Sequence, residues 1–405
     1  MTNNDCVLIA GAGPVGMTTA LALARAGIPV KIFDTLGNIP ADHRASTLHP
    51  STLMMVEELG MTPELLRRGI ESPMFQFRDR VSDRIVAEFD YRAIDDVLTY
   101  PYALQLEQHK TIEVARDIAL GLDTFELIRE REVIDLTQDD NGVVITVQTP
   151  DGATETHAGR FLVGADGGRS IVRKILDIDF PGFTWEERFI IVSTYYDFEE
   201  AAGYRYRNYV AHPDQWCAMI KVPGDQSEGV WRALFPAFGD APDEQLLSDE
   251  WIQALFAECY PYDPPYDLLH RNLYSVHQRV AASFAKGRVA LAGDAAHVNN
   301  PLGGMGMNSG IHDGINLAKK LTEAWHGGDH EALLARYDRQ RRPMAEKYVQ
   351  AQSINNKRLL QETDPDIRQE RLNELYETTQ DEAAHRAYLL RASLVQMVEE
   401  ANSIE

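Results

Sequence analysis

The 405-residue chain is 44% hydrophobic and 25% charged, and its formal net charge at pH 7 is −23. This composition is typical of a globular protein with two or three domains. The negative charge argues against nucleic acid and against anionic membrane surfaces as partners, because both would repel it.

No stretch of the sequence has the length and apolar character of a membrane span. The N-terminus also lacks the basic region and cleavage site of a signal peptide. Cys6, Cys217 and Cys259 lie far apart and show no CxxC or other metal-ligating spacing, which favours reduced, buried thiols. We therefore expect a cytoplasmic protein with no membrane partner and no metal site.

A β-α-β unit is predicted at the start of the chain. Asp5–Ala10 reads as an apolar strand, Gly16–Ala26 as an Ala/Leu-rich helix and Pro29–Phe33 as a second strand. Asp34 ends the second strand, where a carboxylate can accept hydrogen bonds from ribose hydroxyls.

The sequence GAGPVG, residues 11–16, forms the turn between the first strand and the helix. In this context the first glycine permits a tight turn, the second lets the backbone approach a pyrophosphate, and the third lets helix and strand pack closely. The helix N-terminus offers unpaired N–H groups to the phosphates. The unit predicts a dinucleotide site and leaves both NAD and FAD open, with a ligand-free tight turn as the weaker alternative.

Arg44 follows this unit, and its guanidinium could clamp a pyrophosphate, cover a flavin edge or lie on the surface. Amphipathic helices are predicted over Pro50–Leu59 and Leu104–Leu122. Strands are predicted over Glu132–Gln148 and Thr154–Val163, with the hairpin turns DDNG and PDGA between them.

A second motif, FLVGADGGRS, covers residues 161–170 and brings a strand into a turn and a helix. Taken alone, Asp166 in this turn is explained as a helix cap. From Phe189 to Phe238 the sequence holds short aromatic strands separated by turn signals, which predict an antiparallel sheet inserted into the α/β frame.

A third motif begins at the predicted buried strand Arg288–Ala292 and continues as GDAAHVNNPLGGMGMN. Asp294 ends the strand and can accept a hydrogen bond from a ribityl hydroxyl. The glycines that follow leave backbone amides open to a flat heterocycle. A helix is expected from about Asn308 to Trp325, and the chain beyond Leu333 is predicted to be helical.

In this order and at these spacings, the three motifs resemble those of the single-component (class A) FAD-dependent aromatic hydroxylases, typified by 4-hydroxybenzoate hydroxylase and the phenol hydroxylases. The resemblance covers about residues 5–345. It implies an α/β fold in which a Rossmann-like FAD-binding domain carries an inserted antiparallel β-sheet substrate domain and a C-terminal helical segment. The expected division is residues 1–74, 99–180 and 280–345 for FAD binding, 75–98 and 181–279 for substrate binding, and 346–405 for a helical cap.

The resemblance also implies a set of FAD contacts. It assigns the ADP half to the fingerprint and Asp34, matches Arg44 to the family's RA arginine, and places Gln105 at the start of a long helix beside the flavin. Asp166 belongs to a DG motif associated with FAD and pyridine nucleotide, and Asp294 would bind the ribityl chain. The full set is Gly11, Ala12, Gly13, Pro14, Val15, Gly16, Asp34, Arg44, Gln105, Asp166, Gly293, Asp294, Gly304, Gly306, Met307 and Asn308, the last three presenting backbone to the flavin's pyrimidine side.

The segment YVAHPDQW of this chain resembles, more weakly, the corresponding strand and turn of 4-hydroxybenzoate hydroxylase. This resemblance places Tyr209 beside the substrate ring. Ile220 and Val222 occupy positions at which the hydroxybenzoate enzyme has a serine and an arginine that hold a carboxylate. Their presence argues against a benzoate, although Arg232 could supply another cation. Packing within the sheet and a position on a solvated face are the alternative explanations for Tyr209 and Arg232.

Close to the expected chemistry, Pro301 matches a family proline whose carbonyl faces the ring to be oxidised. Asn300 stands where the family commonly has a second proline, and it adds a polar group that could contact substrate. His297 could act as a general base, with local scaffolding as the alternative.

The implied activity is a monooxygenase reaction on a small phenolic or N-heteroaromatic compound. NADPH or NADH would reduce FAD, and O2 would form a flavin C4a-hydroperoxide whose terminal OH is delivered to the ring. A flavin-dependent epoxidase, a polyketide-ring oxygenase and a flavin-binding protein without turnover remain alternatives. The helical tail could cap the active site or form a homodimer contact.

Overall fold

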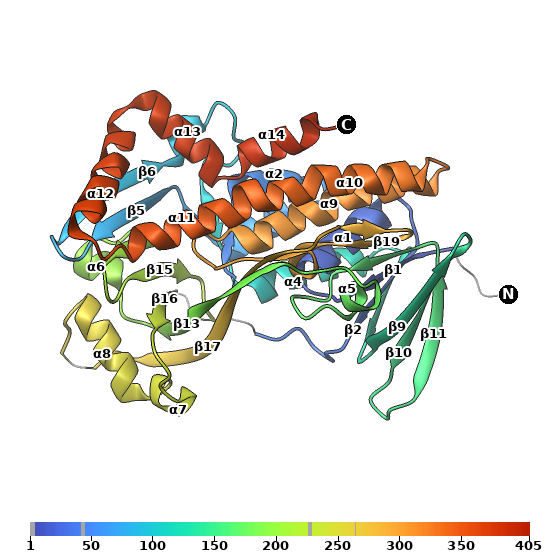
Figure 1. The fold of residues 1–405 in the computed structure, drawn as a ribbon, viewed down its shortest axis with the longest axis horizontal. Helices are drawn as coiled ribbons and strands as arrows, with labels where there is room; N and C mark the ends of the chain where they lie inside the picture. Colours follow the sequence, from blue (N-terminus) through green and yellow to red (C-terminus); the bar gives the residue numbers. More distant parts are fainter. Residues whose placement is uncertain (1–4, 42–44, 226–228, 264) are drawn as a thin grey trace.

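The computed structural model describes residues 5–41, 45–225, 229–263 and 265–405. Two sheets organise these residues, one mainly parallel and one mainly antiparallel, and a run of C-terminal helices crosses both (Figure 1). The predicted α/β class, inserted antiparallel sheet and C-terminal helical segment are thereby confirmed.

The six-stranded sheet is parallel except for one edge strand and has the order β18-β19-β12-β1-β2-β8. Its central strands are short apolar runs buried along their whole length, as parallel strands covered on both faces should be. Helix α1 packs between α4 and α9 beside this sheet. The elements are β1 Val7–Ala10, α1 Pro14–Arg25, β2 Val30–Asp34, α4 Gln108–Ala119, β8 Phe125–Arg129, β12 Phe161–Gly164, α5 Ile171–Ile175, β18 Ala285–Lys286, β19 Val289–Leu291 and α9 Met305–Trp325.

Two smaller sheets flank this core. The hairpin strands β9 Glu132–Asp139, β10 Gly142–Gln148 and β11 Thr154–Gly159 form one, with the two turns where DDNG and PDGA predict them. The other consists of β3 Thr47–Leu48, β7 Ala103–Gln105 and β4 Ile70–Ser72, near helices α2 Pro50–Glu57 and α3 Thr62–Arg68.

The eight-stranded sheet has the order β20-β17-β13-β16-β15-β14-β5-β6, and its one parallel pair is β14 with β5. Large aromatic side chains fill its core, among them the fully buried Trp216 and Phe189. Its elements are β5 Met74–Asp79, β6 Arg84–Asp90, β13 Gly182–Thr194, β14 Arg207–Ala211, β15 Cys217–Val222, β16 Val230–Ala237, β17 Leu268–Val280 and β20 His297–Val298, with helices α6 Phe198–Ala202, α7 Asp243–Leu246 and α8 Asp249–Cys259 alongside.

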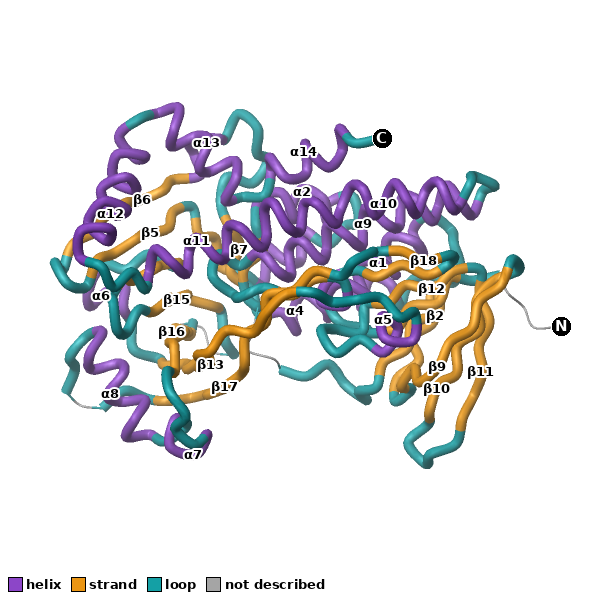
Figure 2. Tube along the Cα trace, viewed as in Figure 1, coloured by secondary structure: helices purple, strands orange, loops and turns teal. Residues whose placement is uncertain are grey.

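Strands β13 and β17 connect the two halves of the molecule. They pair antiparallel over most of their length and run as a long ribbon from the antiparallel sheet toward the parallel one (Figure 2). Both strands belong to the eight-stranded sheet, and β17 also pairs with β20, which follows the parallel strand β19 in the chain.

The C-terminal helices run along one side of both sheets (Figure 1). Helix α10 His330–Met344 continues through a wider turn at 345–350 into α11 Ala351–Leu360, followed by α12 Pro365–Gln380, α13 Glu382–Ala392 and α14 Val395–Ser403. Tyr388 of α13 stacks on Phe89 of β6, with ring centroids 4.1 Å apart. Within the described ranges, no helix is long and apolar enough to cross a membrane.

Two predicted helix boundaries are wrong. The helix expected over Leu104–Leu122 begins only at Gln108, because Ala103–Gln105 pairs as a strand with β3 and β4. The helix expected from about Asn308 begins at Met305, immediately after Gly304, whose left-handed backbone (φ 65°) ends the preceding loop.

Candidate active site

A cavity of about 1400 Å3 lies between the carboxyl ends of the parallel strands and the inner face of the antiparallel sheet. At one end it is lined by the fingerprint turn and by the turns after β2, β12 and β19. At the other end it is lined by side chains of β13 to β17, and residues 298–307 border it between these ends. Open α/β sheets bind their ligands in this crevice outside the carboxyl ends of the strands.

The fingerprint glycines divide into two kinds. A Cβ on Gly11 (φ 96°) would lie 2.4 Å from the Ala165 carbonyl oxygen, and one on Gly16 would lie 1.9 Å from the Gly11 oxygen, so both serve close packing. A Cβ on Gly13 meets nothing within 4 Å, and Gly13 lines the cavity. It precedes α1 without a side-chain cap, so open space adjoins the N-terminal amides of that helix.

Asp34 ties the end of β2 to the fingerprint turn. Its Oδ2 accepts a hydrogen bond from the Ala12 amide at 2.7 Å, and its Oδ1 accepts one from the Leu36 amide at 2.8 Å. The residue lines the cavity, as do Pro14 and Val15. The carboxylate therefore lies where a ribose beside the fingerprint would reach it.

Asp166 lies between the start of α5 and the cavity. Through Oδ2 it accepts at 2.8 and 3.1 Å from the amides of Ile171 and Val172, the first two residues of α5, whose N-cap is Ser170. Its Oδ1 is buried and finds no hydrogen-bond partner within the described part of the chain, although the residue lines the cavity. A buried acceptor of this kind fits a ligand hydroxyl or N–H.

Residues 293–307 supply the other wall of the cofactor end. Asp294 lies in the short 3-10 turn Gly293–Ala295, is exposed, and lines the cavity together with Gly304, Gly306 and Met307. Helix α9 begins here without a side-chain cap. Two uncapped helix N-termini, the open space at Gly13 and the free Oδ1 of Asp166 together fit an elongated dinucleotide such as FAD.

Several predicted cofactor residues lie behind the cavity wall. Gly16 and Gly293 pack against neighbouring backbone or side chains, and Gln105 is buried at the end of β7, where its Oε1 accepts from Thr47 Oγ1 at 2.8 Å. None of these three is among the lining residues. Arg44 lies outside the described residues.

Asn308 is the clearest difference from the predicted cofactor contacts. It lies inside α9, fully buried, and does not line the cavity. Its Oδ1 accepts from the His49 amide at 2.8 Å and from Thr52 Oγ1 at 2.7 Å, and its Nδ2 donates to the Thr47 and Gly304 carbonyls at 2.8 and 2.6 Å. Its side chain therefore joins α9 to the β3–α2 segment.

His297 occupies a buried polar cluster instead of the cavity wall. Its Nε2 lies 2.8 Å from Asp313 Oδ2, and the other oxygen of Asp313 accepts from Arg341 Nε at 2.6 Å. All three side chains are at most 2% exposed. A group in this position cannot touch substrate, so the placement favours the scaffolding alternative over general-base catalysis.

Asn300 and Pro301 are adjacent in the sequence but differ in their access to the cavity. Pro301 lines the cavity, whereas Asn300 is fully buried and does not. The amide of Asn300 donates to Gln278 Oε1 at 3.1 Å, and its Oδ1 accepts from the Leu302 amide at 3.1 Å. Asn300 therefore shapes the loop that carries Pro301, and the predicted direct substrate contact does not fit its position.

At the substrate end, Tyr209, Ile220 and Arg232 line the cavity, while Val222 is buried outside it. Burial raises the pKa of Tyr209, which keeps its phenol neutral at pH 7. Arg207 also lines this end of the cavity; it was not among the predicted site residues, although strand alternation places it on the same face as Tyr209.

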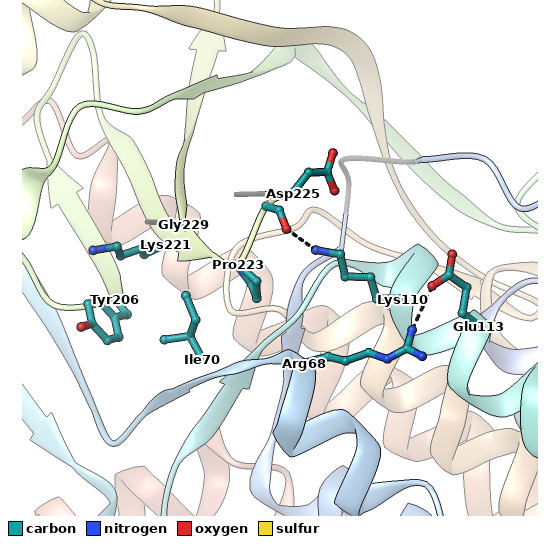
Figure 3. A pocket seen from close by; sticks show the side chains of 10 residues that line it. Arg68, Ile70, Lys110, Glu113, Tyr206, Lys221, Pro223, Asp225 and Gly229 are labelled. Atoms are coloured by element: carbon teal, nitrogen blue, oxygen red, sulfur yellow. Dashed lines mark hydrogen bonds and ion pairs between the residues drawn. The ribbon is translucent and has the colours of Figure 1, made fainter. Parts of the chain in front are cut away.

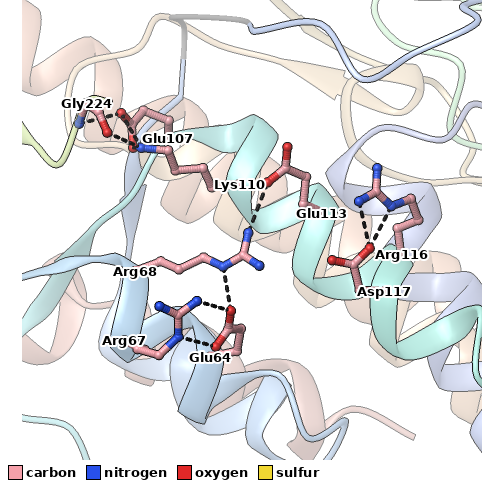
Figure 4. Close-up of polar contacts among 9 residues, drawn as sticks. All are labelled: Glu64, Arg67, Arg68, Glu107, Lys110, Glu113, Arg116, Asp117 and Gly224. Atoms are coloured by element: carbon pink, nitrogen blue, oxygen red, sulfur yellow. Dashed lines mark hydrogen bonds and ion pairs between the residues drawn. The ribbon is translucent and has the colours of Figure 1, made fainter. Parts of the chain in front are cut away.

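A second cavity, of about 550 Å3, lies outside this site, between α4 and the end of β15 (Figure 3). Its cations already have partners. Arg68 pairs with Glu64 and Glu113 at 2.7 and 3.0 Å, and Lys110 contacts Glu107 at 3.2 Å and donates to the Gly224 carbonyl at 2.5 Å (Figure 4). Lys221 pairs with Asp197 at 3.0 Å. This cavity consequently has little unbalanced charge for an anionic ligand.

The position of Asp294 leads to a prediction about cofactor affinity. Replacing Asp294 by alanine should raise the Kd for FAD about tenfold, equivalent to about 1.4 kcal/mol, because the hydrogen bond that we expect this exposed carboxylate to accept from a ribityl hydroxyl would be lost. Isothermal titration of the apoprotein with FAD measures the change. An unchanged Kd would refute the assignment of Asp294 to the cofactor.

Comparison with known proteins agrees with this geometry. A family model described as "FAD binding domain" matches residues 5–352. A para-nitrophenol 4-monooxygenase of Pseudomonas sp. (strain WBC-3) is 31% identical over 96% of this chain and 96% of its own. The 6-hydroxy-3-succinoylpyridine 3-monooxygenase of Pseudomonas putida is 29% identical over 90% of this chain and 91% of its own. The crystal structure of a p-nitrophenol 4-monooxygenase from Pseudomonas putida DLL-E4 is 28% identical and superposes with a TM-score of 0.91 over 98% of this chain and 99% of that one.

Proposed function

The chain belongs to the family of single-component FAD-dependent aromatic hydroxylases, and from that membership we propose that it oxidises a small phenolic or N-heteroaromatic ring with NAD(P)H and O2 as co-substrates. One observation carries the proposal. A single cavity is lined at one end by the fingerprint glycines and at the other by the inner face of the antiparallel sheet, with Pro301 between. A dinucleotide and a ring bound at these two ends would meet beside Pro301.

The residues at the fingerprint end would hold FAD, which would supply the hydride-accepting and oxygen-activating chemistry that the side chains of this protein lack. The chain's own residues hold both partners and keep water away. The substrate end is lined largely by apolar side chains, namely Ile191, Ala218, Ile220, Leu234, Val276 and Leu302. Such a lining limits unproductive loss of activated oxygen to water.

Pro301 has no backbone N–H, so its carbonyl is the only main-chain polar group it can present to the ring. A ring hydroxyl that donates to this carbonyl would be oriented with respect to the cofactor end. Asn300 and Gln278 hold the loop from behind through the hydrogen bonds described above. We infer that they act as positioning residues for Pro301.

The similarity in length to a relative that acts on a single ring bears on the size of the substrate. The chain matches a nitrophenol monooxygenase over nearly the full length of both proteins. This supports a single-ring substrate over a fused polyketide ring, because the two chains are closely similar in length and in overall fold.

The proposal is tested by measuring flavin reduction without oxygen in the FAD-loaded protein, with NADPH and NADH, and with and without candidate rings. We expect flavin absorbance in the purified protein and an acceleration of about tenfold or more, a barrier change of about 1.4 kcal/mol, with 4-nitrophenol or a hydroxypyridine. Absence of flavin absorbance after FAD loading would contradict the proposal. Acceleration only by a fused polyketide ring would favour that alternative, an epoxide product would favour the epoxidase, and flavin binding without acceleration by any ring would favour a protein without turnover.

A further inference from the structure

Arg207 lies on β14 and lines the substrate end of the cavity, with only 3% of its surface exposed. Its Nη2 donates to the hydroxyl of Tyr91 at 2.8 Å. The guanidinium carbon lies 4.1 Å from the ring centroid of Phe75 and 5.7 Å from that of Tyr91. One nitrogen of the guanidinium is therefore hydrogen-bonded, and the group lies close to two aromatic rings.

The rest of the guanidinium lacks hydrogen-bond acceptors. Within the described ranges, Nε and Nη1 of Arg207 are buried and have no hydrogen-bond partner, and no carboxylate forms an ion pair with the residue. Arg341, which is equally buried, shows the usual arrangement, because its Nε donates to Asp313 at 2.6 Å. Buried arginines are normally paired in this way.

The groups around Arg207 are also neutral near pH 7. Burial and the nearby charge of Arg207 lower the pKa of His49 to about 3, so its imidazole carries no charge. Burial raises the pKa of Tyr209 and of Tyr388, so both phenols keep their protons. The positive charge of Arg207 is thus left without a compensating negative charge by the groups packed around it.

An isolated charge inside a protein is costly, and this one lines the cavity in which the ring is expected. The aromatic faces of Phe75 and Tyr91 attract the cation, but they provide no acceptors for Nε and Nη1. We propose that Arg207 binds an anionic oxygen of the substrate ring, either a phenolate or a ring carboxylate. This inference rests on the proposed function and specifies its substrate class as anionic aromatic compounds.

The test measures ring binding to the FAD-loaded protein by equilibrium dialysis, independently of turnover. The probes form two matched pairs: 4-nitrophenol at a pH at which it is ionised, against 4-nitrotoluene, and benzoate against nitrobenzene. Arg207→Met keeps the apolar stem and removes the charge, and Arg207→Lys restores the charge with different donors. We expect Arg207→Met to weaken binding of one anion at least about 30-fold, with partial recovery in Arg207→Lys, and to change binding of the neutral probes less than about threefold.

The anion that loses affinity identifies the group that Arg207 holds, and loss for either anion supports the inference. Unchanged anion binding in Arg207→Met would overturn it, as would a wild-type holoenzyme that binds none of the four probes. Failure of the wild-type protein to take up FAD would instead count against the proposed function, because Arg207 lines the substrate end of the cavity.

Thermal unfolding of the same variants separates binding from a purely structural role. Arg78 is the matched control, since its guanidinium also lies over a tyrosine, 4.0 Å from the Tyr204 centroid, but donates to Gln76, Ala202 and Gly203 at 2.9 to 3.0 Å. We expect Arg78→Met to lower the melting temperature and Arg207→Met to leave it unchanged or raise it, because an unpaired buried charge is removed. A comparable loss of stability in both variants, with anion binding intact, would overturn the inference.

Discussion

Replacing Gly13 by valine should greatly weaken FAD binding while the protein still folds. A Cβ at this position meets nothing within 4 Å, and the backbone there is extended with a negative φ of −70°, a conformation that valine adopts without strain. The added methyl groups would instead occupy the space beside the N-terminus of α1, where the pyrophosphate must approach the backbone. We expect the Kd for FAD to rise at least about 100-fold, or about 2.8 kcal/mol, in fluorescence titrations of the apoprotein.

Gly121 provides the control for this substitution. It follows α4, has no positive φ, and its added Cβ would only touch the Ile118 carbonyl oxygen at 3.4 Å, an ordinary contact. Gly121→Val should therefore leave FAD affinity unchanged. If Gly13→Val bound FAD within about threefold of the wild-type affinity, the fingerprint would not be the pyrophosphate site.

The largest expected loss of stability comes from removing the carboxylate of Asp313. This fully buried group pairs with Arg341 and His297 and also accepts from the Gly293 amide at 3.2 Å. Asp313→Ala would leave Arg341 buried without its anion, which typically lowers the free energy of unfolding by about 3–5 kcal/mol. Urea denaturation measures the change, and FAD affinity should fall as well because Gly293 precedes Asp294.

The exposed pair of Asp96 with Arg386 is the control, since both side chains are well solvated. Asp96→Ala should leave the urea midpoint unchanged within error. A loss of less than about 1 kcal/mol in Asp313→Ala would show that the buried cluster contributes little to stability.

The same carboxylate gives the stability a defined pH dependence. Burial opposes ionisation of Asp313, but Arg341 and His297 outweigh it and hold the pKa of this carboxyl below its usual value. A lowered pKa in the folded state means that the stabilisation is present above the unfolded pKa of about 3.9 and is lost as pH falls through the folded value. The stability difference between wild type and Asp313→Ala should therefore be constant near pH 7 and shrink below about pH 4.

Features with local causes were predictable from the sequence. The glycines of residues 11–16 and the apolar runs around them specify the first β-α-β unit, and DDNG and PDGA specify the two hairpin turns. The order of the three motifs was enough to predict the fold class, because the family resemblance depends on their spacing. Pro301, Asp166 and Asp294 line the cavity, and their roles remain predictions.

Features that depend on distant partners were not predictable in the same way. The amphipathic pattern that begins at Leu104 places Gln105 in the predicted helix. In the structure, pairing with β3 and β4 makes Gln105 the last residue of a strand. Asn308 is held by the amide of His49, 259 residues away in the chain. The surroundings of Arg207 were not predictable either. Its neighbours include Tyr91 and Tyr388 of α13, which lie far from β14 in the sequence.

We propose that this cavity brings FAD and an aromatic ring together for transfer of one oxygen atom from O2. The most direct measurement is turnover of 4-nitrophenol by the FAD-loaded protein with NADPH or NADH under 18O2, followed by mass spectrometry of the product. We expect an oxidised ring carrying one 18O atom per turnover, with nucleotide oxidation dependent on the ring. A product whose new oxygen comes from water, formed while FAD is bound, would contradict it.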